Sequence, residues 1–206
     1  FPTRRSSDLE GRGVILSEPS LVATDERNQK VVAIGRNAET LLARSPEVVK
    51  IHRPLVDGVI ADYSVTCTLL NYILSKTVRT VRRMRVMLGV PAVASDVEKR
   101  AVLEALFRSG AKEAYLIETG AAAAIGSGLP VFDPLGNMIV DIGGGTTNIA
   151  VLSLGGIVVS ESLRSGGQKL DAALKEYLRG TYAIVTDDAT VEEMKVYNGS
   201  AVLPLE

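Results

Sequence analysis

The chain has 206 residues, of which 46% are hydrophobic and 23% are charged, a composition typical of a soluble globular protein. Its 23 Lys and Arg residues nearly balance 24 Asp and Glu residues, so the net charge is −1 and no nucleic-acid partner is expected. A single cysteine, Cys67, excludes an internal disulfide framework, and a single histidine, His52, excludes a histidine-rich metal site. No secretory hydrophobic segment opens the chain, so the expected compartment is the cytoplasm.

The first nine residues, Phe1–Leu9, differ from the rest of the chain. They are polar and lack a hydrophobic period, and they resemble the translation of a sequencing adapter. We therefore expect a non-native tail over residues 1–9 that takes no part in the fold. A disordered native N-terminus is the alternative. We also expect truncation at both ends, because Leu205-Glu206 closes no structural element.

From Gly11 onward the pattern alternates between strand and helix. In chain order it predicts strands at 14–16, 21–23 and 30–34, a helix at 37–43, an irregular segment at 52–60, and a helix that begins at Asp62 or Ser64. A strand at 86–90 precedes a helix that Ser95 and Glu98 open with the spacing of a capping box. A strand at 114–117, a helix at 121–127, strands at 138–142, 148–154 and 157–161, and helices at 168–179 and 189–195 follow. This order predicts a mixed α/β fold.

The strongest functional signal is a glycine-rich turn between two apolar strands, with the sequence Asp141-Ile142-Gly143-Gly144-Gly145-Thr146-Thr147. Successive glycines leave no Cβ in the way of a ligand, and a tight turn of this kind can direct several N–H groups at one phosphate. Asp141, at the end of its strand, suits a hydrated Mg²⁺, because Mg²⁺ keeps several waters and takes one or two carboxylates. A plain glycine-rich hairpin is the alternative.

A second glycine turn, Arg164-Ser165-Gly166-Gly167, immediately precedes a helix, and helix N-termini favour anions. An ordinary loop that enters a helix remains open as the alternative. The sequence contains no G-x-x-x-x-G-K-[ST] motif and no complete dinucleotide fingerprint. His52 and Cys67 lack the surroundings of a nucleophilic pair.

Four stretches together resemble the MreB/Mbl family of bacterial actins. They are GRGVILSEPSLVA at 11–23, RPLVDGVIAD at 53–62, LIETGAAAAIGSGLP at 116–130 and NMIVDIGGGTTNIAVLSL at 137–154. The resemblance implies the α/β actin-like ATPase fold, which sugar kinases, heat-shock chaperones and ribonuclease H share in part. It places the first lobe at residues 10–130, with a small subdomain at about 30–53, and the start of the second lobe at 131–206. A chaperone-type ATPase and a small-molecule kinase of the same superfamily remain alternatives.

The resemblance also assigns ligands and residues. It implies ATP and Mg²⁺ as cofactors, and Asp141 would hold the Mg²⁺ through water. The nucleotide-binding positions that carry over are Asp141, Gly143, Gly144, Gly145, Thr146, Thr147, Gly166, Gly167, Glu192 and Lys195.

Several positions depart from the family pattern. The first phosphate loop, expected just upstream of Gly11, is missing. The family's catalytic Glu is Thr119, within Glu118-Thr119-Gly120, and the Gly-Gly-Asp of the third turn ends in Gln168. Because threonine is no base at pH 7, we expect a slow ATPase at most, and an inactive protein in this 206-residue form.

The family's partners are further filament subunits, the inner face of the cell membrane and cell-wall elongation proteins. In this chain Arg79, Arg82 and Arg83 lie in the region that corresponds to a membrane-inserting loop. Their charges would favour anionic headgroups. A solvated helix end, where basic residues complement the helix dipole, is the alternative.

Overall fold

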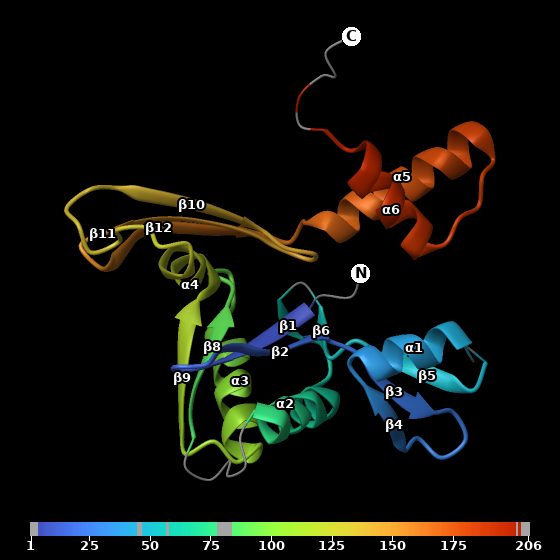
Figure 1. Ribbon diagram of the computed structural model, residues 1–206, viewed down its shortest axis with the longest axis horizontal. Helices are drawn as coiled ribbons and strands as arrows, with labels where there is room; N and C mark the ends of the chain where they lie inside the picture. The colour runs from blue at the N-terminus through green and yellow to red at the C-terminus, as the bar shows by residue number, and fades with distance from the viewer. Residues whose placement is uncertain (1–3, 45–46, 57, 78–83, 201, 203–206) are drawn as a thin grey trace.

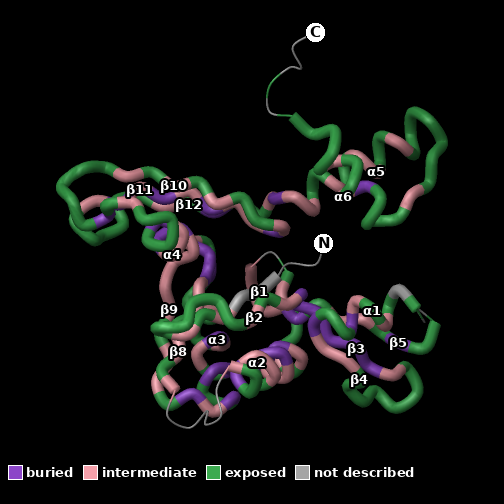
Figure 2. Tube along the Cα trace, viewed as in Figure 1, coloured by how far each residue is buried: buried purple, intermediate pink, exposed green. Residues whose placement is uncertain are grey.

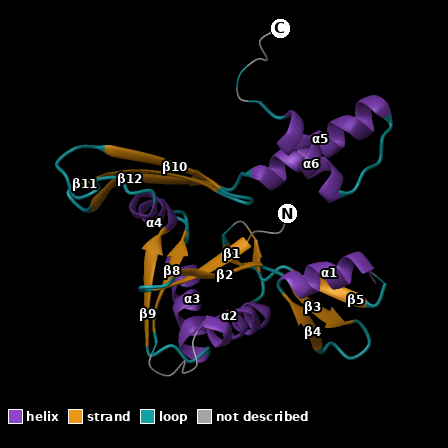
Figure 3. Ribbon diagram, in the orientation of Figure 1, coloured by secondary structure: helices purple, strands orange, loops and turns teal. Residues whose placement is uncertain are grey.

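The computed structural model describes residues 4–44, 47–56, 58–77, 84–200 and 202. Strands and helices alternate along it in an N-terminal region, residues 4–126, and a C-terminal region, residues 137–198 (Figure 1, Figure 3). The mixed α/β order predicted from the sequence is confirmed.

The N-terminal region opens with an antiparallel hairpin and a small sheet. The elements are β1 (Arg4–Leu9), β2 (Gly13–Pro19), β3 (Val22–Asp25), β4 (Val31–Ile34), α1 (Arg36–Arg44), β5 (Val49–His52), β6 (Leu55–Val56) and β7 (Val59–Ile60). The strands β4, β3 and β5 form one antiparallel sheet in that order, and α1 packs on it through buried Ala38. This unit begins at Val22, upstream of the subdomain predicted over residues 30–53.

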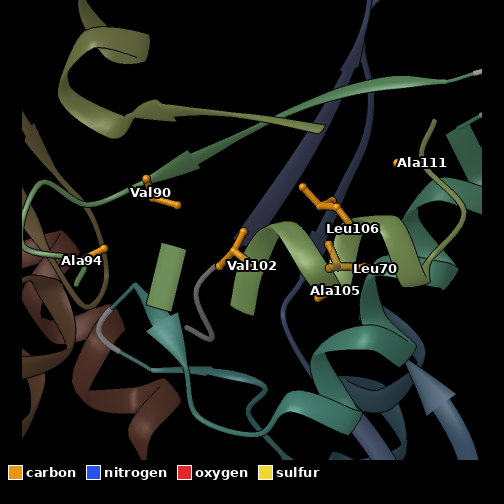
Figure 4. Packing of buried hydrophobic residues seen from close by; sticks show 7 residues of the cluster. All are labelled: Leu70, Val90, Ala94, Val102, Ala105, Leu106 and Ala111. Atoms are coloured by element: carbon orange, nitrogen blue, oxygen red, sulfur yellow. The ribbon is translucent and has the colours of Figure 1, made fainter. Parts of the chain in front are cut away.

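A parallel strand pair forms the rest of the N-terminal region. Its elements are α2 (Tyr63–Thr77), β8 (Arg85–Val90), α3 (Asp96–Arg108), β9 (Glu113–Glu118) and α4 (Thr119–Gly126). The predicted capping box at the start of α3 is confirmed, because Ser95 Oγ accepts from the Glu98 N–H while Glu98 accepts from the Ser95 N–H. Apolar residues from α2, β8, α3 and the loops on either side of α3 form one buried cluster (Figure 4): Leu70, Val90, Ala94, Val102, Ala105, Leu106 and Ala111.

The C-terminal region consists of a three-stranded meander and two helices. Its elements are β10 (Asn137–Ile142), β11 (Thr147–Ser153), β12 (Gly156–Leu163), α5 (Gly167–Tyr182) and α6 (Asp188–Asn198). One face of the meander packs on α4, where Ala124, Ala150 and Leu152 are buried. Helices α5 and α6 lie beyond the end of the meander and are largely exposed (Figure 2).

Two segments differ from the sequence prediction. Residues 4–9 form β1, which pairs with β2 from Arg4 opposite Pro19 to Leu9 opposite Gly13, so the tail expected to stay outside the fold contributes a strand. Residues 52–60, predicted to be irregular, contain the short β6–β7 hairpin. Neither segment has the alternating hydrophobic pattern that predicts a strand. In both, pairing with a neighbouring strand stabilises the extended structure.

Candidate functional site: two glycine turns at one end of the meander

The turn that joins β10 to β11 presents a row of backbone donors. The Gly143 N–H donates to the Thr146 carbonyl at 2.8 Å, which closes the turn. Within the described residues, the N–H groups of Gly144, Gly145 and Thr146 have no hydrogen-bond partner. Three consecutive unpaired N–H groups in a glycine turn can bind an anion with several oxygen acceptors, such as a phosphate.

The second glycine turn packs directly on the first. The N–H of Gly167 donates to the Gly143 carbonyl at 3.0 Å, and the N–H of Gln168 donates to the Gly144 carbonyl at 2.9 Å. A Cβ on Gly166 would lie only 2.8 Å from the Gly144 carbonyl oxygen, so no other residue fits there without a shift of the backbone. The structure therefore requires glycine at 166 for the close approach of the two turns.

This packing changes the role expected for the start of α5. The first N–H groups of the helix bond to the carbonyls of the first turn, so they are not available to an anion. Thr147 is engaged as well, because its hydroxyl donates to the Ser165 carbonyl at 2.8 Å. The second turn and Thr147 thus hold the first turn in shape, and Gly144–Thr146 carry the free donors.

Lys195 connects α6 to the second turn. Its Nζ lies 2.7 Å from Asp171 Oδ1 on α5 and donates to the Gly167 carbonyl at 3.3 Å. The side chains of Lys195 and Asp171 are 24% and 14% exposed, so the ion pair is largely sheltered from water. Glu192 lies one helical turn before Lys195 and is partly buried.

The N-terminal region reaches the first turn at Gly58, and it also carries the predicted catalytic position, Thr119. Gly58, in the turn between β6 and β7, lies against the first turn, since a Cβ there would be 3.4 Å from Thr146 Cγ2. Thr119 is the first residue of α4 and is partly buried. The adjacent Glu118 has its Oε2 buried without a hydrogen-bond partner among the described residues, so this carboxylate is turned into the protein. The contact at Gly58 has no local sequence signal.

The next features are those that bear on the predicted membrane contact and on metal binding. Arg79, Arg82 and Arg83 lie outside the described residues. Among the residues that the structure describes, no helix is long and apolar enough to cross a membrane. Nor does this part of the chain contain a group of three or more His, Cys, Asp or Glu side chains placed to hold a metal ion.

Comparison with known proteins gives close relatives in sequence. The sequence profile of the family described as MreB/Mbl protein matches residues 7–205. The cell shape-determining protein MreB of Pasteurella multocida is 44% identical over 203 residues, which cover 95% of this chain and 58% of that protein. The cell shape-determining protein Mbl of Bacillus subtilis is 41% identical over 190 residues, covering 91% of this chain and 57% of that protein.

Solved structures agree. The crystal structure of MreB5 of Spiroplasma citri bound to ADP matches with a TM-score of 0.90 and 33% identity, over 98% of this chain and 61% of that one. The MamK double helical filament matches with a TM-score of 0.73 over 90% of this chain and 59% of that chain, and at 22% identity this likeness concerns the fold alone. The chain thus spans less than two thirds of the proteins that it matches. It belongs to the MreB/Mbl family and has the actin-like fold.

Proposed function

We propose that the protein is an ATP-binding, actin-like cytoskeletal protein that assembles into filaments and directs bacterial cell shape. The observation that carries this proposal is the glycine turn with free N–H groups at Gly144, Gly145 and Thr146. The second turn packs against it through Gly166. The similarity to relatives described as cell shape-determining proteins supports it, as does the ADP bound to a structural relative. The kinase and chaperone alternatives find no support among these relatives.

Magnesium fits the same site. Asp141 is the penultimate residue of β10, close to the glycine turn. Its Oδ2 accepts from Asn148 Nδ2 at 3.5 Å, which leaves Oδ1 without a partner among the described residues. One carboxylate oxygen is a suitable donor for a hydrated Mg²⁺, which binds through its waters. We propose that Asp141 holds the ion through water, and that the N–H groups of the turn hold the phosphate oxygens. When bound, Mg²⁺ would neutralise phosphate charge.

The nucleotide proposal is tested by adding a single methyl group to the second turn. In the complete gene product, Gly166→Ala forces the two turns apart, so we expect loss of ATP binding and of ATP-dependent sedimentation of filaments. Gly180→Ala is the matched control: a Cβ on Gly180 meets nothing within 4 Å, and alanine suits a helix better than glycine. Gly166→Ala protein that binds ATP as tightly as the unmodified protein would contradict the proposal.

We further propose that the filaments lie on the inner face of the cell membrane, together with cell-wall elongation proteins. Arg79, Arg82 and Arg83 would supply part of the membrane affinity, at about 1 kcal/mol for each basic residue near an anionic surface. In liposome co-sedimentation of the complete gene product, we expect binding to rise with anionic lipid content and to fall when the three arginines are replaced by serine. Binding that is indifferent to both changes would exclude this role.

A further inference from the structure

A row of polar side chains crosses the meander at the site. Asn148 on β11 lies directly opposite Asp141 on β10 and opposite Ser162 on β12. Asn148 is 3% exposed and Ser162 is 6% exposed. The next positions on the same face of β11, Ala150 and Leu152, are buried and apolar. Polar side chains in such a place are costly unless their hydrogen bonds are satisfied.

Along this row each group donates a hydrogen bond to the next one. The Ala92 N–H, in the loop between β8 and α3, donates to Ser162 Oγ at 3.1 Å, and Ser162 Oγ donates to Asn148 Oδ1 at 2.7 Å. Asn148 Nδ2 is therefore the end of the amide that faces Asp141, at 3.5 Å from its Oδ2. Because an ionised carboxylate only accepts hydrogen bonds, the reversed amide would leave oxygen against oxygen.

A second contact joins the same two segments. Glu98, in the first turn of α3, lies 4.0 Å from Arg164, just beyond β12. The loop between β8 and α3 is thus linked to the end of β12 by a partly buried hydrogen bond, and the start of α3 is linked to it by an ion pair at the surface. The row therefore connects the carboxylate at the glycine turn with the backbone of the N-terminal region.

We infer that Asn148 and Ser162 are positioning residues for Asp141: the row fixes one carboxylate oxygen, turns the other toward the hydrated magnesium of a bound nucleotide, and ties this geometry to the backbone at Ala92. The inference rests on the proposed nucleotide-binding function. Hydrogen-bond partners of metal-binding side chains commonly change metal affinity by about 10–100-fold when they are removed.

The test separates magnesium from nucleotide. Binding of a fluorescent ATP analogue to the complete gene product is titrated with Mg²⁺, and is also measured in EDTA. For Ser162→Ala we expect the half-maximal Mg²⁺ concentration to rise about tenfold or more, while the affinity in EDTA stays unchanged. Thr66→Val is the matched control, because it also removes a buried hydroxyl. That hydroxyl, on α2, donates to the Pro54 carbonyl and takes no part in the row.

The outcomes distinguish the positioning role of the row from nucleotide binding itself. An unchanged Mg²⁺ requirement, or an equal loss of affinity with and without Mg²⁺, overturns the positioning role and leaves nucleotide binding intact. Unmodified protein that binds no nucleotide under any condition overturns the proposed function and this inference with it. If Ser162→Ala does not fold, Asn148→Leu carries the same test, and failure of both variants to fold assigns the row to folding and overturns the inference.

Discussion

We propose that Thr119 occupies the position of the family's catalytic glutamate. It is the first residue of α4, and Glu118 before it has an extended backbone, with φ −65° and ψ 136°. The two side chains therefore leave the chain in different directions, and Glu118 Oε2 is buried. A neighbouring carboxylate in this geometry does not replace a base at 119.

We expect Thr119→Glu to accelerate phosphate release from the complete gene product at saturating ATP and Mg²⁺. Restoring a positioned general base contributes typically about 10²–10⁴-fold. Thr119→Gln is the control, because it supplies a side chain of the same length without a base. Equal rates for the unmodified protein and Thr119→Glu, with filaments assembled in both, would show that Thr119 does not limit hydrolysis.

The first glycine turn between two strands could be predicted from the sequence, because the turn is one continuous segment; its binding of a nucleotide stays a prediction. The row of Asn148 and Ser162 could not, since it depends on the register between strands, and register is set by pairing across the sheet. For the start of α5 the sequence left an anion site and an ordinary loop open. It gave no sign of the packing of Gly166 against Gly144, in which the N–H groups of Gly167 and Gln168 bond to carbonyls of the first turn.

At the scale of elements, α5 and α6 are joined by two ion pairs of different character. Lys195–Asp171 is sheltered, whereas in Lys175–Asp188 the side chains are 42% and 80% exposed. Exposed pairs contribute little to stability, about 0–1 kcal/mol. Lys195 also donates a hydrogen bond to the Gly167 carbonyl, and a charged hydrogen bond in a sheltered place contributes more, about 1.5–3 kcal/mol.

We therefore expect Lys195→Met to lower the free energy of unfolding by about 1.5–3 kcal/mol and to weaken ATP binding, because the Gly167 carbonyl loses its donor. Lys175→Met is the matched control on the same helix pair, with an expected change below about 1 kcal/mol. Urea unfolding and ATP titration measure both effects. Equal losses for the two variants would mean that shelter from water does not distinguish these pairs.

The predictability of an element depended on whether its signal was local. The helix α3 was predicted together with its first residues, because Ser95 and Glu98 close a capping box within four positions. The strand β1 was not predicted, since its residues are polar and its partner β2 supplies the order. The origin of residues 1–9 stays a prediction, although the family match begins within β1, at residue 7.

At the scale of the whole molecule, one face of the meander exposes apolar side chains on both of its outer strands, interrupted on β12 by Glu161. Met138, Val140 and Ile142 on β10 are 62%, 47% and 68% exposed, and Val159 and Leu163 on β12 are 55% and 53% exposed. The strand register places Met138 and Val159 on one side of the sheet with Ile142 and Leu163. Exposed apolar patches of this kind mark surfaces that bind other apolar groups.

We expect the 206-residue chain to bind a hydrophobic dye such as ANS strongly and to bind ATP much more weakly than the complete gene product. Dye binding follows from the exposed face, and weak ATP binding from the match to only one of the family's phosphate loops. Val140→Lys should reduce dye binding, whereas Val97→Lys, at a more exposed position on α3 (79% against 47%), should not. Micromolar ATP affinity of the 206-residue chain would contradict the expectation.

The meander has a kinetic consequence as well. Within the described residues its strands β10, β11 and β12 pair only with their neighbours along the chain, so the contact order of this segment is low and little loop-closure entropy opposes it. Isolated hairpins form in about 1–10 μs. The approach of Gly58 to Thr146, in contrast, joins residues far apart in the chain. The first glycine turn is therefore expected to form early in folding. The contact between Gly58 and Thr146 is expected to form late.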